Sequence, residues 1–204
     1  GKTEYVKGLS KSNINVVSVA GNHMGDAKSE GLLETLDLLE KNNITFVGAG
    51  TSLNEAYQCK KITKKGTTFG FLAFNNVPGS IGKPSKKKPG IAWLDQLAID
   101  AIESCDSMVN ELVVMVNWGT EYTHFPRKKE TVWAKKMVSA GADLILGDQA
   151  HWVQIHEKIQ EKHVSYGLGN YIFDQHWSQK TTEGIIQRFI YFEKKILAIE
   201  TIPI

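Results

Sequence analysis

The chain has 204 residues, of which 42% are hydrophobic and 23% are charged, as is typical of a globular protein with one sizeable domain or at most two small ones. The net charge of +2 is too small to indicate nucleic-acid or anionic-membrane binding by itself. No apolar run approaches the ~18 residues of a membrane-spanning helix, and the first residues do not have the pattern of a signal peptide.

The first quarter of the sequence predicts a βαβ unit. Residues 1–13 have the character of a helix end that leads directly into a strand. The apolar, β-branched run at 13–21 is bounded by glycine and predicts a buried strand. Residues 27–43 place leucines on one helical face and end on two asparagines, and 44–50 predicts a second strand closed by glycines. This order and length are those of a βαβ unit.

The middle of the chain continues the alternation of strands and helices. Two strands around a Lys-Gly turn are predicted within 59–77, and a loop rich in Pro, Gly and Lys follows at 78–90. Residues 95–111 predict a helix, and 111–119 predict a buried strand. The side chains expected to face inward from that helix are Leu97, Ala101 and Ile102.

The last third predicts one more helix and further strands. The helix is expected at 128–142, with Gly141 as its C-terminal cap. Strands are expected at 143–151 and 162–173, and the tail 184–204 predicts two strands around a polar turn. Strands alternating with helices indicate an α/β fold, while the hairpins favour a mixed sheet or two sheets over a purely parallel one. The apolar face of the helix is expected to contain Val132, Ala134 or Lys135, Met137 and Val138.

The two cysteines, Cys59 and Cys105, are far apart in the sequence and have no metal-type spacing. Two buried thiols and one disulfide both fit this pattern. Cysteine usage alone therefore does not indicate a cellular compartment.

Polar side chains of ligand type follow four of the predicted strands. In open α/β sheets, ligands bind beyond the carboxyl ends of the strands, so these residues are expected to share one crevice. Imidazole, amide and carboxylate groups together suit Zn, Mn or Fe. The four groups are Asn22, His23 and Asp26; Asn117, Trp118, Glu121 and His124; Asp148, Gln149 and His151; and Asn170, Asp174 and His176.

Several of these residues also have a purely structural interpretation. A histidine at a strand end is more often a hydrogen-bonding loop residue than a ligand, but the glycine before Asn22 and His23 allows a sharp turn beside an ion. Asn170 could serve only to satisfy strand-end carbonyl groups. The lysine-rich stretch 83–88 is either a solvated loop or a landing site for an anionic substrate. A surface or structural role is expected for His124, His156 and His163.

Ordered blocks along nearly the whole chain resemble the poly-γ-glutamate capsule biosynthesis family of the CapA type, a branch of the calcineurin-like metallophosphoesterases. They are "VVSVAGNHMGDAKSEGLLETLDLLEKNNITFVGAG", "PGIAWLD", "VNWGTEYTHFP", "AGADLILGDQAHWVQ", "YGLGNYIFDQ" and "TEGIIQRF". The resemblance implies a single domain over 1–204, with two packed mixed β-sheets flanked by helices and a two-metal site at the strand ends.

The resemblance also implies roles for the strand-end residues. His23 and Asp26 are the catalytic candidates, with His23 as general acid or transition-state stabiliser. The divalent metal, Mn, Zn or Fe, would polarise a phosphoryl-type oxygen. The candidate metal ligands are Asn22, Asn117, Gln149 and His151, and the candidate substrate-binding residues are Trp118, Glu121 and Asn170.

The sequence departs from the family pattern at two of these positions. Asn117 and Gln149 stand where the family usually has histidine, and an amide is a weaker ligand than imidazole. The family's early Gly-Asp strand and Asn-Leu-Glu blocks are also absent, which indicates either a fragment or a degenerate member. We therefore expect metal to bind weakly, if at all.

Two functional hypotheses follow. The first is a metal-dependent hydrolase of the metallophosphoesterase type, acting on an anionic polymer or a phosphoester. The second is a non-catalytic module that assists polymer synthesis or export beside membrane-bound synthesis components. The family implies a location outside the cytoplasm at the cell envelope. Nucleic-acid binding is not expected, because aromatic residues do not interleave with the basic stretch.

Overall fold

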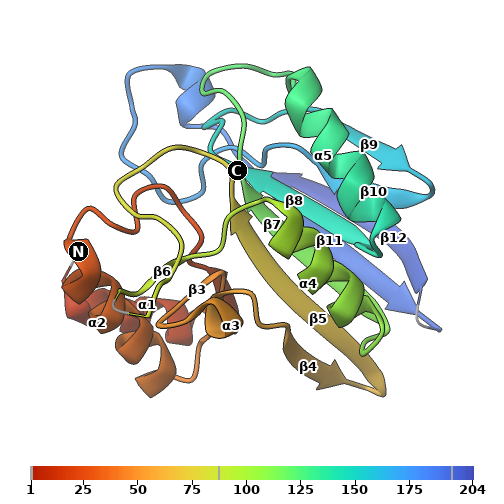
Figure 1. The fold of residues 1–204 in the computed structure, drawn as a ribbon. Coiled ribbons are helices and arrows are strands. Elements are labelled where there is room, and N and C mark those ends of the chain that lie inside the picture. The colour runs from red at the N-terminus through yellow and green to blue at the C-terminus, as the bar shows by residue number, and fades with distance from the viewer. Residues whose placement is uncertain (1, 87, 194) are drawn as a thin grey trace.

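The computed structural model describes residues 2–86, 88–193 and 195–204 (Figure 1). The helices are η1 (Thr3–Tyr5), α1 (Val6–Lys11), α2 (Lys28–Lys41), α3 (Leu53–Ala56), α4 (Gln96–Asp106), α5 (Lys128–Ser139) and η2 (Gln179–Thr181). The strands are β1 (Val16–Ser18), β2 (Thr45–Val47), β3 (Ala49–Gly50), β4 (Lys60–Lys64), β5 (Thr67–Asn75), β6 (Gly90–Ile91), β7 (Glu111–Asn117), β8 (Leu144–Asp148), β9 (His156–Ile159), β10 (Lys162–Ser165), β11 (Ile185–Phe192) and β12 (Lys195–Pro203).

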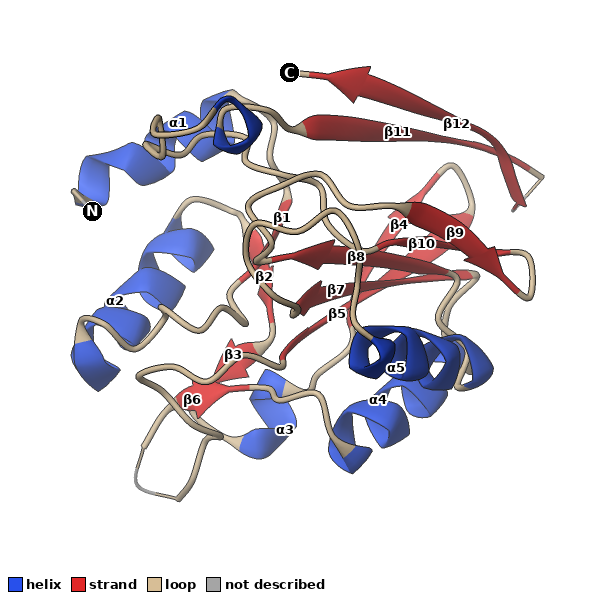
Figure 2. Cartoon of the chain, turned by 90° about the horizontal axis from the view of Figure 1, so that it is seen from above, coloured by secondary structure: helices blue, strands red, loops and turns tan. Residues whose placement is uncertain are grey.

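A six-stranded mixed sheet forms the centre of the molecule, in the order β4-β5-β7-β8-β10-β9. Strands β5, β7, β8 and β10 are parallel, and the two edge strands run antiparallel to their neighbours. Helices α4 and α5 cover one face, and the β11–β12 hairpin lies over the other (Figure 2). The predicted α/β class with a mixed sheet is confirmed, and the expected second layer consists of this antiparallel pair in the described residues.

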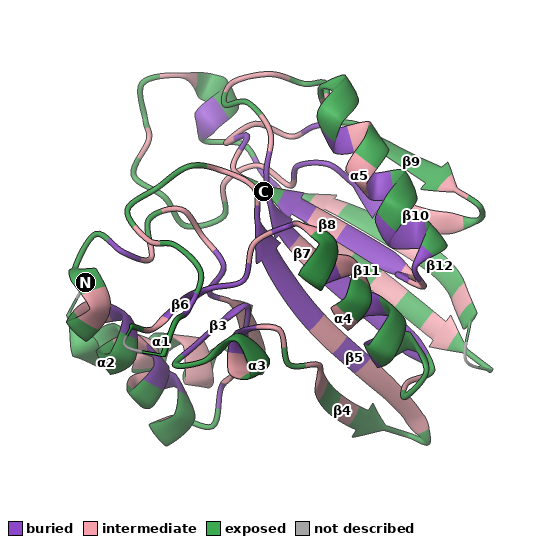
Figure 3. Ribbon diagram, in the orientation of Figure 1, coloured by how far each residue is buried: buried purple, intermediate pink, exposed green. Residues whose placement is uncertain are grey.

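Burial follows from this layering (Figure 3). Strand β7 is almost entirely buried because the helices cover one side and the hairpin and the N-terminal βαβ unit cover the other, which explains its continuous apolar sequence. Strand β11 instead alternates between half-buried and exposed residues, since only one of its faces meets the sheet. Phe69 of β5 contacts Tyr191 of β11 edge to face, with 5.0 Å between the ring centroids.

The N-terminal part forms the predicted βαβ unit. Strands β1 and β2 pair in parallel, and α2 packs a leucine face against a core cluster of its own. Gly48 ends β2 with a φ of +90°, and an added Cβ there would lie 2.6 Å from the Cβ of Ala20. The buried leucines of α2 are Leu32, Leu36 and Leu39.

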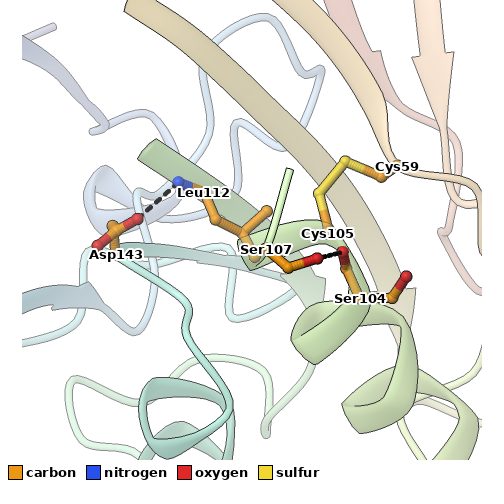
Figure 4. The surroundings of a disulfide bond; sticks show 6 residues. All are labelled: Cys59, Ser104, Cys105, Ser107, Leu112 and Asp143. Atoms are coloured by element: carbon orange, nitrogen blue, oxygen red, sulfur yellow. Dashed lines mark hydrogen bonds between the residues drawn. A yellow bond between two sulfur atoms is a disulfide. The ribbon is translucent and has the colours of Figure 1, made fainter. Parts of the chain in front are cut away.

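Cys59 and Cys105 form a disulfide that joins the start of β4 to the end of α4 (Figure 4). The alternative of two free thiols is therefore wrong. The bond lies in the main core, where Cys105 is fully buried and Gly70 of β5 packs against it.

Three details of the predicted elements need correction. Leu97 and Val132 are exposed rather than inward-facing, because the buried stripe begins at Ala98 in α4 and passes through Glu130 and Ala134 in α5. The antiparallel edge strand β9 was not predicted, since its sequence is polar and exposed. The strand expected at 162–173 ends at Ser165, and an irregular segment carries Asn170 to the sheet edge. Gly141 follows α5 with a φ of +114°, as its predicted capping role requires.

Candidate functional site

The parallel strands end level with one another, because Asn75 pairs with Asn117 and Asn117 pairs with Asp148. A cavity of about 320 Å³ opens at this edge, and the turn after β1 reaches it from the N-terminal unit. We call it the rim pocket. The predicted convergence of distant strand ends is confirmed. Its lining residues are Asn22, His23, Asn117, Glu121, Asp148, Gln149, Ala150, His151, Gly167, Leu168, Gly169, Asn170, Phe173 and Gln175.

His151 is held firmly on the sheet side of the rim pocket. Its ring lies between those of Tyr122 and Phe173, with centroid distances of 5.8 and 5.1 Å. The Nδ1 atom is 2.9 Å from Oδ1 of Asn170, whose Nδ2 donates to the carbonyl oxygen of Thr181. That second bond orients the amide so that its oxygen must accept from His151. Nε2 of the neutral ring is therefore the unprotonated nitrogen.

His23 lies on the opposite side of the rim pocket and is far more exposed. Its Nδ1 is 2.8 Å from Oδ2 of Asp26, and Ser80 Oγ donates to the other carboxylate oxygen. The side chains of His23 and Asp26 are 80% and 60% exposed. The hydrogen bond from His23, followed by that from Ser80, lowers the pKa of Asp26. Because an ionised carboxylate can only accept, Nδ1 carries the proton in this imidazole also.

Amide and carboxylate groups form the floor of the pocket. Asn117 Nδ2 donates to Oδ1 of Asp148 at 2.8 Å and to Oε1 of Gln149 at 3.2 Å. Gln149 Nε2 donates in turn to Glu121 Oε1 at 3.0 Å. Desolvation by the surrounding protein raises the pKa of Asp148, and the hydrogen bond from Asn117 opposes that shift.

Two buried oxygens of this site have no hydrogen-bond partner among the described residues, namely Oδ1 of Asn117 and Oε1 of Gln175. An unpartnered buried acceptor is costly, which indicates that a donor or a cation belongs there. No Lys or Arg lines the pocket in the described part of the chain. The donor set of amide oxygens, carboxylates and imidazole nitrogens therefore fits a divalent cation.

The ligand set is nevertheless weaker than that of a typical metalloenzyme. Nowhere in residues 2–86, 88–193 and 195–204 do three His, Cys, Asp or Glu side chains come together as a metal-binding group. Asn117 and Gln149 occupy the positions where further imidazoles would complete one. The geometry thus fits an ion that is held in part by amide oxygens.

The backbone at the end of β8 is strained. Gln149 and His151 both have positive φ angles, +84° and +56°, in a region that costs a non-glycine residue roughly 1–2 kcal/mol. The turn is held in place by Tyr122, whose N–H donates to the carbonyl oxygen of Ala150. Such strain is common where a side chain must be presented in one orientation.

The pocket includes most of the predicted site residues. Asp26 does not line it but contacts His23. Trp118 is corrected as a substrate-binding candidate, because its indole is 1% exposed, stacks on Tyr166 and donates to that residue's carbonyl oxygen. The histidines outside the pocket are His124, His156, His163 and His176, and Asp174 also lies outside it.

From the sequence, Asp148 is placed among the ligand-type residues but is not selected as a metal ligand, and no role is assigned to Phe173, Gln175 or Tyr122. Asp148 could have been assigned, because it is the last residue of its strand and directly precedes Gln149. The other three lie on irregular segments whose path no sequence pattern indicates. In the described residues, no helix combines the length and apolar character that crossing a bilayer requires.

The sequence matches the family described as bacterial capsule synthesis protein PGA_cap over residues 1–175. It is 34% identical over 188 residues to the PGA biosynthesis protein CapA of Bacillus subtilis (strain 168), covering 90% of this chain and 49% of the relative. It is 29% identical over 193 residues to the capsule biosynthesis protein CapA of Bacillus anthracis, covering 91% and 46%. The chain thus spans about half the length of these curated relatives.

Solved structures share the fold at low sequence identity. A hypothetical protein from Thermus thermophilus superposes with a TM-score of 0.63 at 12% identity, covering 98% of this chain and 80% of that one. The NAD nucleotidase NadN of Haemophilus influenzae superposes with a TM-score of 0.59 at 15% identity, covering 98% and 41%. At these identities the likeness shows the fold alone, and that fold is the metallophosphoesterase-like one that the resemblance implied.

Proposed function

The chain belongs to the bacterial capsule synthesis protein family PGA_cap, and from that premise we propose that its rim pocket is the site of a metal-assisted hydrolase of the phosphoesterase type. The substrate would be an anionic polymer of the capsule type or a phosphoester used in making it. The observation that carries the proposal is the unpartnered, buried Oδ1 of Asn117, in a pocket whose lining includes two imidazoles and two carboxylates.

The residues on the two sides of the pocket would have different roles. Asn117, Asp148 and His151 would hold a divalent ion, with Asn22 and Gln149 completing its surroundings. The chemistry that such an ion supplies when bound is Lewis-acid polarisation of a phosphoryl oxygen. Asn170 keeps the proton of His151 on Nδ1, so Nε2 is free to bind.

His23 is the proposed general acid. With Nδ1 directed at Asp26, its protonated form presents the Nε2–H to the pocket and can protonate a leaving-group oxygen. Asp26 holds the Nδ1 side of the ring, and Ser80 orients the carboxylate. Glu121 and Asn170 remain the proposed substrate-binding residues at the rim.

The proposed setting is the cell envelope, outside the cytoplasm, beside membrane-bound polymer synthesis components. The disulfide between Cys59 and Cys105 supports this setting, because disulfides persist in oxidising compartments and are rare in the cytosol. The names of the relatives, PGA and capsule biosynthesis proteins, support an anionic polymer as the substrate or product.

The test combines metal retention with hydrolysis. The purified chain is dialysed against Mn²⁺ or Zn²⁺ and its metal content is measured, and hydrolysis of bis(p-nitrophenyl) phosphate is then followed. We expect weak, saturable binding of metal and slow turnover, both of which Asn117→Ala and His151→Ala abolish. His163→Ala, a histidine outside the pocket, is the matched control and should change neither.

A second candidate is a non-catalytic module that assists polymer synthesis or export. The absence of three strong metal ligands in one group among the described residues favours it. Polymer binding without any metal-dependent turnover would support this candidate and overturn the hydrolase.

A further inference from the structure

A second cavity, of about 570 Å³, lies next to the His23 side of the rim pocket, between the start of α2 and the loop after β5. We call it the lysine pocket. Its chemistry is opposite to that of the rim pocket, because ammonium and hydroxyl donors replace carboxylate and amide acceptors. The side chains that define it are Lys28, Ser29, Glu30, Ser80, Lys83 and Lys88.

The two cavities share one wall of side chains. His23 lines the rim pocket, its Nδ1 contacts Asp26, and Asp26 accepts from Ser80, which lines the lysine pocket. The backbone joins the same two segments, since the N–H of Ser80 donates to the carbonyl oxygen of Asn22 at 3.4 Å. The two pockets are therefore neighbours, with His23, Asp26 and Ser80 between them.

Glycines fix the lysine-bearing loop against this wall. A Cβ added to Gly79 would overlap the carbonyl oxygen of Asn22, and one added to Gly25 would lie 2.6 Å from the Cβ of Ile81. Only residues without a side chain allow the turn after β1 and the loop after β5 to approach so closely. The lysine pocket is thus attached to the His23 side at a defined position.

The charge of the lysine pocket is positive. Lys83 pairs with Asp95, and Glu30 is the one acidic residue among the described lining residues. Lys28 and Lys88 are exposed and have no ion-pair partner in the part of the chain that the structure describes. Two exposed ammonium groups facing a cavity attract anions, and salt screens that attraction.

We infer that the lysine pocket is a second subsite for an extended polycarboxylate chain, which binds a carboxylate there while a neighbouring segment occupies the rim pocket. The inference rests on the anionic polymer of the proposed function and deepens it by requiring a substrate that spans both cavities. A chain with carboxylates at regular spacing gains from two linked contacts, each of which is weak alone.

The test measures binding of poly-γ-glutamate to the full chain by calorimetry at low ionic strength. The double variant Lys28→Gln/Lys88→Gln should bind the polymer about fivefold more weakly, as expected for the loss of two exposed ion pairs. The double variant Lys64→Gln/Lys65→Gln removes the same charge from the exposed β4–β5 turn and should bind like the unmodified chain. If both double variants bind the polymer equally more weakly than the unmodified chain, or if neither does, the inference is overturned.

The same variants separate this inference from the proposed hydrolase. Lys28→Gln/Lys88→Gln should retain the metal and hydrolyse bis(p-nitrophenyl) phosphate like the unmodified chain, because that small probe needs only the rim pocket. His151→Ala should lose the metal and with it the hydrolysis of bis(p-nitrophenyl) phosphate, and adding Lys28→Gln/Lys88→Gln to that variant should still weaken its polymer binding further. If the protein has no hydrolytic activity and Lys28→Gln/Lys88→Gln still weakens polymer binding, the subsite is supported and the proposed hydrolase is rejected.

Discussion

The rim pocket is assembled from two regions that are built very differently. Its sheet side stands on β7 and β8, which are buried strands paired with neighbours on both edges. Its N-terminal side stands on the turn after β1, a three-residue strand whose residues are only half buried and whose sheet has two strands. His151 belongs to the first region and His23 to the second.

The sheet side is therefore a rigid support for His151, and the N-terminal side is a more adjustable support for His23. His151 is fixed by two rings and an oriented amide, whereas His23 is fixed by one carboxylate in an exposed setting. A group that binds an ion gains from being preorganised, while a group that transfers a proton must be able to exchange with solvent. The two regions thus match the two proposed roles.

Reducing the disulfide should have the largest effect and should act on the sheet region. Cys59 and Cys105 are 46 positions apart, and closing a loop of that length stabilises a fold by about 4 kcal/mol in the chain-entropy description. Thermal unfolding with and without dithiothreitol measures the loss. The variant Cys59→Ala/Cys105→Ala should show no further response to the reductant. Two titratable thiols in the native, unreduced protein would contradict the disulfide.

The next effect is a pH dependence of stability, also in the sheet region. Burial, with the nearby charge of Asp143, raises the pKa of Glu111 to about 7, while Lys162 acts in the opposite direction. The folded protein therefore binds this proton more tightly than the unfolded chain. This difference stabilises the fold fully below the ordinary pKa of Glu111 near 4.5. The stabilisation is lost as the pH rises through about 7, which lowers the free energy of unfolding by about 3 kcal/mol at most.

Urea denaturation at pH 5 and pH 8 measures that change in the free energy of unfolding. Glu111→Gln should remove most of it, because the amide cannot ionise. Glu34→Gln, on the exposed side of α2, is the matched control in the N-terminal region and should leave the pH dependence unchanged. A variant Glu111→Gln with the original pH dependence would show that another group is responsible.

A matched pair of glycine substitutions compares the two regions directly. A Cβ at Gly147 in β8 would overlap the carbonyl oxygen of Tyr166, and one at Gly79 would overlap that of Asn22. Because the sheet cannot yield, Gly147→Ala should lower the free energy of unfolding by about 1–3 kcal/mol. Gly79→Ala lies in an exposed loop that can shift, so it should cost less than Gly147→Ala while it displaces the His23 turn.

Chemical denaturation gives the two stabilities, and hydrogen exchange at residues 22–26 reports the displacement. Faster exchange there in Gly79→Ala, without a comparable loss of stability, is the expected result. Equal destabilisation by both substitutions would remove the distinction between a rigid and an adjustable side.

The sequence predicted the sheet region better than the N-terminal side of the site. Continuous apolar runs such as β7 indicate strands with two covered faces, and polar residues directly after them locate the rim. The pairing of Cys59 with Cys105 and the polar strand β9 depend on tertiary contacts between distant segments, which leave no local pattern. Trp118 was misassigned because a buried indole and a ligand-stacking indole have the same sequence context.

The smallest effects concern the partners of the two imidazoles. Asn170→Ala removes the acceptor that keeps the proton of His151 on Nδ1, so the affinity for Mn²⁺ should fall about tenfold. Nitrogen-15 NMR of the imidazole should show a mixture of tautomers, and Asn170→Asp, which keeps an acceptor oxygen, should restore both properties.

Asp26→Asn changes only an exposed contact of His23, so turnover of bis(p-nitrophenyl) phosphate should change about fivefold or less and Mn²⁺ affinity should not change. If Asp26→Asn lowers the affinity for Mn²⁺ as much as Asn170→Ala does, the two sides of the pocket do not have separate roles. The assignment of metal binding to His151 and proton transfer to His23 is then wrong.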